Sequence, residues 1–237
     1  MATDNQIIQG LWIGPELSAM EQLSIASFLK NGHEYHLYVY NEMKNLSPGC
    51  VLRDANEILP SGRVFQYQQY PSYAGFANFF RYKLLLERGG WWADTDVICL
   101  KPFDFSGAHV FASEIVNQAE VVASAILKAP VKSEAMAYAW AVCQSKQPEN
   151  LVWGETGPRL VADGHQRAGK RARQRADPAV RTRRVLVAEE ADPHGVGHAA
   201  ISSRTSRTRP LESPGGTPIS SSTRRRRASR SRAGSAR

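Results

Sequence analysis

The sequence predicts an α/β fold in which a mixed, mostly parallel sheet is flanked by helices. Two observations carry this prediction. Between residues 6 and 146, short segments rich in branched and aromatic residues alternate with segments of helical period, an order typical of parallel strands joined by helices. Every Phe, Trp and Tyr lies within residues 1–163, so this part holds the side chains for a sizeable core.

The first third of the chain supplies strands and one helix by this pattern. We expect a buried strand over residues 6–13 and a helix over 17–30, where apolar residues recur at helical spacing. The aromatic and branched segment 34–40 predicts a second strand. Residues 51–59 predict a short strand or helical turn, and residues 64–70 predict another short strand.

The central stretch, residues 76–98, reads FANFFRYKLLLERGGWWADTDVI. Apolar residues at helical spacing predict a helix over 78–88, and the double glycine at 89–90 supplies the positive φ that ends a helix. An apolar strand then begins at Trp91 and resumes over 97–100.

Two aspartates, Asp94 and Asp96, stand within this strand. Residues i and i+2 of an extended strand share a face, so the two carboxylates are expected to converge. Carboxylates beside a buried strand are costly unless a cation meets them, and hard oxygen ligands suit Mg²⁺ or Mn²⁺. The alternative is a pair of acids that faces a loop or caps a helix.

Beyond residue 100 the pattern predicts two more strands and a helix. The strands are expected over 109–112 and 121–127, separated by a polar segment over 114–120. The helix is expected over 133–146 with Ser133 as its N-cap.

The chain divides into two parts of opposite charge. Residues 1–163 hold 12 Lys and Arg against 17 Asp and Glu, whereas residues 164–237 hold 18 against 5, and Lys170 is the only lysine among those 18. The second part lacks aromatic residues. We therefore predict a folded domain over 1–163 and a basic, disordered tail over 164–237.

The phrase FRYKLLLERGGWWADTD, at residues 80–96, resembles the sugar-nucleotide glycosyltransferases with a DXD motif, which include capsular-polysaccharide and α-1,4-galactosyl- or mannosyltransferase-like enzymes. The resemblance covers about residues 6–162. It implies a GT-A-like, Rossmann-type domain and a metal-dependent, retaining transfer of sugar. The implied donor is a nucleotide-sugar, UDP-sugar ahead of GDP-mannose, and the implied acceptor is a glycan or lipid-linked molecule.

The resemblance implies that Asp94 and Asp96 hold the Mn²⁺ or Mg²⁺ ion at the donor diphosphate. It also places Arg81 at the donor, although the residue type alone allows a salt bridge to one of these aspartates equally well. Asn78 falls where many relatives carry an aspartate against the sugar hydroxyls, which leaves the choice of sugar open.

Trp12, in the phrase LWIG, resembles the tryptophan that stacks on uracil in clostridial-type glucosylating toxins. The resemblance implies a platform for the base, with Gly14 allowing the backbone to approach the nucleotide. The alternative is a tryptophan of the core.

A second phrase, WGETGP at residues 153–158, resembles the W-x-x-TGP loop of the same family. The resemblance implies that Glu155 or Thr156 reaches the sugar or the acceptor, just before Gly157 interrupts regular secondary structure. The alternative is a plain connection whose tryptophan fills the core. Ser124, where relatives often carry asparagine, is a weaker candidate for the sugar-binding loop.

The resemblance stops near residue 162, where relatives continue with the acceptor side and commonly a further metal ligand. A sequence rich in arginine and nearly without lysine is what translation of a GC-rich gene in a wrong reading frame yields. We therefore hypothesise a frameshift near codons 160–166. The sheet is then expected to be incomplete and turnover poor or absent. Translation of the other two frames tests the hypothesis, which fails if neither continues the family pattern.

Two other functions compete with glycosyl transfer. Residues 94–98 approach the first motif of haloacid-dehalogenase-type phosphatases, with Asp94 as nucleophile and Asp96 as acid/base, but a convincing late acidic pair is missing. The arginine run at 224–227 suits nucleic acid or anionic lipid. It lacks interleaved aromatics, so no specific nucleic acid partner is expected.

The sequence also carries signals about location. The N-terminal residues show no basic region before a long apolar run, and no stretch reaches the roughly 20 apolar residues of a membrane span. The three cysteines form no framework. We therefore expect a cytoplasmic protein that associates peripherally with the membrane through its acceptor.

Overall fold

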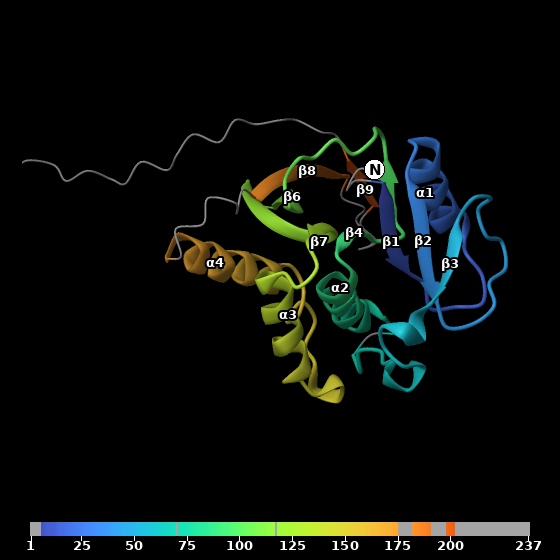
Figure 1. Ribbon diagram of the computed structural model, residues 1–237. Coiled ribbons are helices and arrows are strands. Elements are labelled where there is room, and N and C mark those ends of the chain that lie inside the picture. The colour runs from blue at the N-terminus through green and yellow to red at the C-terminus, as the bar shows by residue number, and fades with distance from the viewer. Residues whose placement is uncertain (1–5, 70, 117, 175–181, 191–197, 202–237) are drawn as a thin grey trace, which may run out of the picture. The chain divides into compact units, whose positions relative to one another are not determined.

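Strands and helices alternate along the chain in the computed structural model of the protein (Figure 1), which describes residues 6–69, 71–116, 118–174, 182–190 and 198–201. The strands are β1 (Ile7–Leu11), β2 (Glu34–Val39), β3 (Val51–Asp54), β4 (Gly90–Ala93), β5 (Val97–Cys99), β6 (His109–Val116), β7 (Ala119–Ala129), β8 (Thr182–Glu190) and β9 (His198–Ile201). The α-helices are α1 (Ala19–Lys30), α2 (Ala74–Arg88), α3 (Glu134–Gln144) and α4 (Pro158–Gln174). Short 3-10 helices span Ala55–Glu57, Ser61–Arg63 and Pro148–Asn150.

The strands form a mixed sheet in the order β3-β2-β1-β4-β7-β6-β8-β9-β5. Strand β1 pairs in parallel with β2 on one side and with β4 on the other, and β2 pairs in parallel with β3. Strand β7 is antiparallel to both β4 and β6, while β8 is parallel to β6. The expected α/β fold, with a mixed, mostly parallel sheet and flanking helices, is confirmed.

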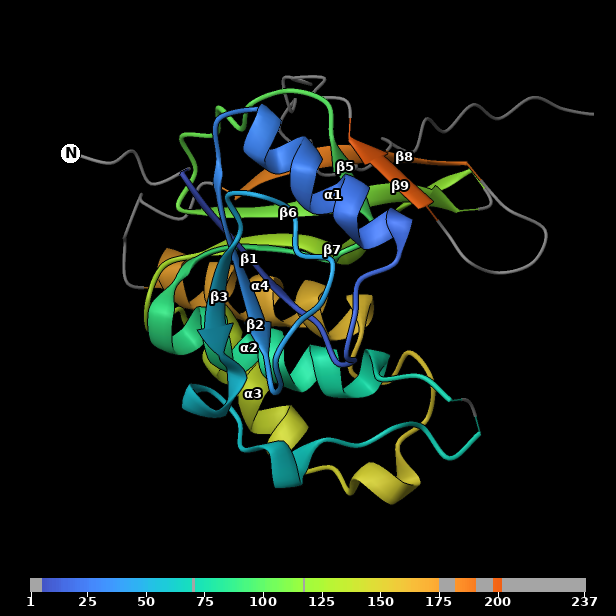
Figure 2. The ribbon, with the colours of Figure 1, turned by 90° about the vertical axis from the view of Figure 1, so that its right-hand side faces the viewer.

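Helices cover both faces of the sheet, with α1 on one side and α2, α3 and α4 on the other (Figures 1 and 2). Successive side chains of a strand point to opposite faces, so each central strand contributes to two cores. In β4, Trp91 and Ala93 join the core beneath α1, and Trp92 joins the core beneath α2. All three are buried, which explains why this strand is apolar at every position.

The helix ends follow from local sequence. The Ser18 hydroxyl accepts from the Met20 N–H at 3.2 Å, and the Glu21 carboxylate accepts from the Ser18 N–H at 2.7 Å, which together make a capping box for α1. Ser133 caps α3 as predicted. Helix α2 ends at Gly89, whose φ of 65° is the left-handed value expected of the double glycine.

Two predictions about strands differ from the structure, and a third left two alternatives that are both realised. The short strand predicted over 64–70 is wrong for the described residues of that segment: they lie in no strand, and Phe65 packs on Phe76 and Phe79 of α2, with ring centroids 5.8 and 5.2 Å apart. Strands β6 and β7 extend through much of the polar segment 114–120. Residues 51–59 form both expected elements in turn, a strand and then a 3-10 helix.

The predicted boundary at residue 163 falls within α4, which continues to Gln174, and β8 and β9 lie beyond it. The rest of the predicted tail, residues 175–181, 191–197 and 202–237, lies outside the described residues. The division of the chain into a domain and a disordered tail therefore stays a prediction, as does the frameshift. None of the helices in the described ranges is both long and apolar enough to span a membrane.

Candidate functional site

The candidate site begins where two neighbouring parallel strands end. Strand β1 runs into Trp12, and β4 runs into Asp94, at the same edge of the sheet because the two strands are paired in parallel. The chain also changes direction here. It passes from β1 outward to β2 and β3 and then returns to the other side of β1 as β4. In open α/β sheets such a switch point is where ligands bind.

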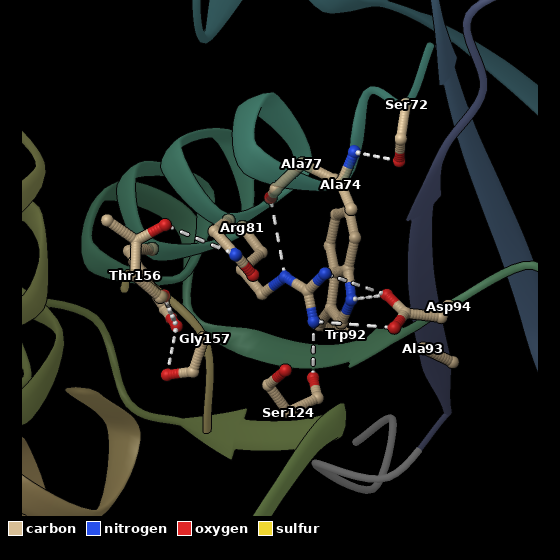
Figure 3. Close-up of polar contacts among 12 residues, drawn as sticks. Ser72, Ala74, Ala77, Arg81, Trp92, Ala93, Asp94, Ser124, Thr156 and Gly157 are labelled. Carbon is tan, nitrogen blue, oxygen red and sulfur yellow. Dashed lines mark hydrogen bonds and ion pairs between the residues drawn. The ribbon is translucent and has the colours of Figure 1, made fainter. Parts of the chain in front are cut away.

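Arg81 of α2 connects the residues around the end of β4 (Figure 3). One terminal nitrogen of its guanidinium lies 3.1 Å from Asp94 Oδ1, and the other donates to Asp94 Oδ2 at 3.4 Å and to the Ser124 carbonyl of β7. The guanidinium also lies 5.0 Å from the centre of the Trp92 ring. Arg81 is 4% exposed, so its charge depends on these contacts for compensation.

The Asp94 carboxylate is held from two sides. Trp92 Nε1 donates to Asp94 Oδ1 at 2.7 Å, and Arg81 contacts both carboxylate oxygens. Burial raises the pKa of Asp94, while the Arg81 charge and the hydrogen bonds from Trp92 and Arg81 oppose that rise. The Asp94 N–H donates to the Ala125 carbonyl at 2.9 Å, which ties the end of β4 to β7.

Asp94, Thr95 and Asp96 form a turn and not a continuous strand. The Val97 N–H donates to the Asp94 carbonyl at 3.2 Å, which closes the turn between β4 and β5. The argument that both carboxylates share one face of an extended strand therefore does not apply. The two acids remain in one short turn at the edge of the sheet.

The donor set of this turn fits a divalent cation that is completed by a diphosphate. Two carboxylates within three residues, Asp94 and Asp96, are hard oxygen ligands, and Mg²⁺ is commonly bound by one or two carboxylates together with substrate phosphates and water. Within the described ranges, no group of three or more His, Cys, Asp and Glu side chains is placed to hold a metal.

Trp12 and Gly14 lie on the loop after β1. The indole of Trp12 is partly buried against the core beneath α1, and its Nε1 donates to the Glu16 carbonyl at 2.9 Å. A Cβ on Gly14 would lie 3.1 Å from Trp12 Nε1. Glycine at this position therefore leaves room for the indole, in addition to any role toward a ligand.

The WGETGP loop is anchored to α2 through Thr156 (Figure 3). Thr156 is fully buried, its hydroxyl accepts from Asn78 Nδ2 at 3.3 Å, and its carbonyl accepts from the Tyr82 hydroxyl at 2.7 Å. Gly157 begins the hydrogen bonding of α4, since its carbonyl accepts from the Leu160 N–H at 3.0 Å.

The remaining polar residue of the loop, Glu155, pairs with Lys146 at 2.5 Å. This contact and the hydrogen bond from the Val152 N–H lower the pKa of Glu155. The contacts thus form two sets that both start from α2: Asn78 with Thr156, and Arg81 with Asp94 and Ser124. Glu155 instead faces Lys146.

Several residues of this network carried no assigned role from sequence. Trp92 supplies a hydrogen bond to Asp94, and its position two residues earlier was the available signal. Tyr82 holds the Thr156 carbonyl from a position 74 residues away, and no local pattern predicts that pairing. Trp153 does not fill the core as the alternative interpretation had it, because it is 57% exposed.

Comparison with known proteins identifies the central segment. Residues 18–119 match the family model described as a glycosyltransferase sugar-binding region containing a DXD motif. Curated proteins give no match. Among solved structures, the PaToxG glycosyltransferase is 16% identical with a TM-score of 0.50, and the alignment covers 75% of this chain and 77% of that one. A mutant transferase is 10% identical with a TM-score of 0.47, covering 70% and 86%.

The likeness to the PaToxG glycosyltransferase supports the fold, and the family match includes α1, α2 and the turn that carries Asp94 and Asp96. Residues 18–119 therefore resemble the DXD-containing sugar-binding regions of glycosyltransferases, and this match supports a transferase enzyme.

Proposed function

We propose that the protein transfers a sugar from a nucleotide-sugar donor, with UDP as the favoured nucleotide and with retention of configuration, to a glycan or lipid-linked acceptor. The observation that carries the proposal is the position of Asp94 and Asp96. They follow β4 at the switch point of the sheet, beside the loop that follows β1. A nucleotide bound across these two strand ends lies beside both carboxylates.

In this proposal Asp94 and Asp96 hold a Mn²⁺ or Mg²⁺ ion, which supplies neutralisation of the charge that develops on the leaving diphosphate. Arg81 and the Trp92 N–H fix the Asp94 carboxylate at the donor. Among the residues that the structure describes, no candidate nucleophile stands out near Asp94, so the proposal contains no covalent sugar–enzyme intermediate.

The other donor-binding roles follow from position. Trp12 and Gly14 receive the nucleotide base on the loop after β1. Asn78 and Thr156 hold the WGETGP loop beside the donor through their hydrogen bond. Ser124 contributes its carbonyl, which orients Arg81.

The competing functions have less support. A haloacid-dehalogenase-type phosphatase needs a late acidic pair in addition to its first motif, and the sequence offers no convincing one. The family match to a sugar-binding region also counts against this reading of the two aspartates. The basic run at 224–227 lies outside the described residues, so binding of nucleic acid or lipid, and a peripheral position in the cytoplasm, stay predictions.

The proposal is tested by thermal unfolding of the full chain with Mn²⁺, with and without UDP. A ligand at 100 times its dissociation constant adds about 2.7 kcal/mol of stability. We expect UDP to raise the melting temperature only when Mn²⁺ is present. The UDP-dependent rise should be absent from the double variant Asp94→Asn/Asp96→Asn.

Asp163→Asn, at an exposed acid of α4, is the matched control and should keep the full rise. The comparison uses the difference with and without UDP, because the aspartate variants also change the basal stability. A cooperative transition that UDP and Mn²⁺ leave unchanged in the native chain would contradict the proposed donor site.

A further inference from the structure

The WGETGP loop presents a large apolar side chain to water in a fixed position. Trp153 is 57% exposed. It occupies a tight turn in which the Glu155 N–H donates to the Val152 carbonyl at 3.1 Å and Gly154 has a φ of 80°. The Glu155 carboxylate accepts from the Val152 N–H at 3.2 Å and pairs with Lys146. The turn is thus closed by its own backbone and tied to the rest of the protein.

The indole of Trp153 is further supported by Tyr67. The two ring centroids are 5.1 Å apart with an interplanar angle of 47°. Tyr67 is 4% exposed and is hydrogen-bonded to the Thr156 side chain and to the Gly154 backbone. Thr156 in turn accepts from Asn78, one helical turn before Arg81 on α2. The exposed tryptophan is therefore connected, through Tyr67, Thr156 and Asn78, to the helix that also carries Arg81, the partner of Asp94.

A tryptophan held in this way is suited to bind a sugar ring. Its indole offers a large apolar area whose ordering is already provided by the turn and by Tyr67, so little side-chain freedom is lost on binding. A pyranose ring carries a face of C–H groups that packs against an aromatic face, while its hydroxyl groups stay in water. Aromatic side chains with few polar groups around them are typical of such ligand sites.

We propose that Trp153 is the platform on which a pyranose ring of the glycan acceptor stacks. This inference rests on the proposed function, since it supplies the acceptor side of the same reaction. It names the acceptor class as a carbohydrate, recognised through the C–H face of a sugar ring. Lipid-linked and free glycans share that chemistry.

The test is saturation-transfer NMR on the full chain with methyl pyranosides of glucose, galactose, mannose and N-acetylglucosamine at millimolar concentration. We expect transfer to the ring C–H protons of at least one glycoside. Trp153→Ala should reduce it about fivefold, the loss expected when one aromatic stacking contact is removed. Trp153→Phe should restore most of the transfer, and Val152→Ala, at the neighbouring exposed residue, should leave it unchanged.

Equal transfer in Trp153→Ala and the native chain, or no transfer to any of the four glycosides, would overturn the inference. Melting temperatures of the variants verify that each is folded. The UDP-dependent rise with Mn²⁺ is measured on the same samples and reports on the donor site alone. If UDP gives no rise but glycosides still bind in a Trp153-dependent way, the donor site is refuted. If UDP gives the rise but glycoside binding does not depend on Trp153, only the sugar platform is refuted.

Discussion

Replacing Asp94 with alanine tests whether its pairing with Arg81 supports the fold as well as the site. The Arg81 side chain is 5% exposed and the Asp94 side chain 28% exposed. Removing one partner of a buried ion pair costs about 3–5 kcal/mol, because the other charge is left without compensation. Here water reaches the vacated space and the Ser124 carbonyl still accepts from Arg81. We therefore expect the free energy of unfolding to fall by about 2–3 kcal/mol.

Urea denaturation of a double-mutant cycle measures this coupling. Arg81→Met removes the charge and keeps much of the buried chain, so the double variant Asp94→Ala/Arg81→Met leaves neither charge unpaired. We expect the double variant to lose about 1–2 kcal/mol less than the sum of the two single losses. Asp104→Ala, at an exposed acid, should change stability by less than about 0.5 kcal/mol. Additive losses at Asp94 and Arg81 would refute the reasoning.

Two further predictions concern the fold. In Gly89→Ala, which has a φ of 65°, the added Cβ would lie 2.7 Å from the Val131 nitrogen. Chemical denaturation should therefore show a larger loss of stability than for Gly32→Ala, where φ is 81° and nothing lies within 4 Å of the Cβ. Equal losses of stability in the two variants would show that the backbone conformation alone is the cause. Burial and the nearby His165 lower the pKa of His109 to about 4, and burial lowers the pKa of His165. Because the unfolded histidines bind protons first, their contribution to stability is complete above about pH 6.5 and decreases toward pH 4. Thermal melts of His109→Gln/His165→Gln should fall less steeply over that range, and an unchanged slope would contradict the assignment.

The elements around residue 90 could be predicted from sequence because their signals are local. A helical period, two glycines and a fully apolar strand follow one another within the segment that forms α2 and β4. The segment 64–70 failed because branched and aromatic residues predict burial more directly than strand pairing. Phe65 is used against α2 and pairs with no strand. Strand β6 was predicted too short because Ile115, at 63% exposure, lies in a part of the β6–β7 hairpin that does not face the core.

The site divides in the same way. The place of Arg81 on the helix before β4 and of Asp94 and Asp96 directly after β4 was accessible from sequence, because all three lie in one short continuous segment. The residues that contact the WGETGP loop could not be predicted from sequence. Asn78 lies 78 residues from Thr156 in sequence, and their hydrogen bond depends on how the loop before α4 packs against α2. Whether Trp153 filled the core or faced water was likewise a question of tertiary packing that its motif left open.

The contacts of Arg81 also bear on the two roles that its sequence context allowed, which are binding of the donor and a salt bridge to one of the aspartates. A guanidinium has five N–H groups. Its Nε donates to the Ala77 carbonyl at 3.3 Å, one terminal nitrogen serves Asp94 Oδ2 and the Ser124 carbonyl, and the other lies 3.1 Å from Asp94 Oδ1. Four N–H groups are thereby engaged, and a two-point fork onto a phosphate needs two that are free. The geometry therefore favours Arg81 as the residue that positions Asp94. Under the proposed function, this salt bridge would support the donor site and would not compete with it.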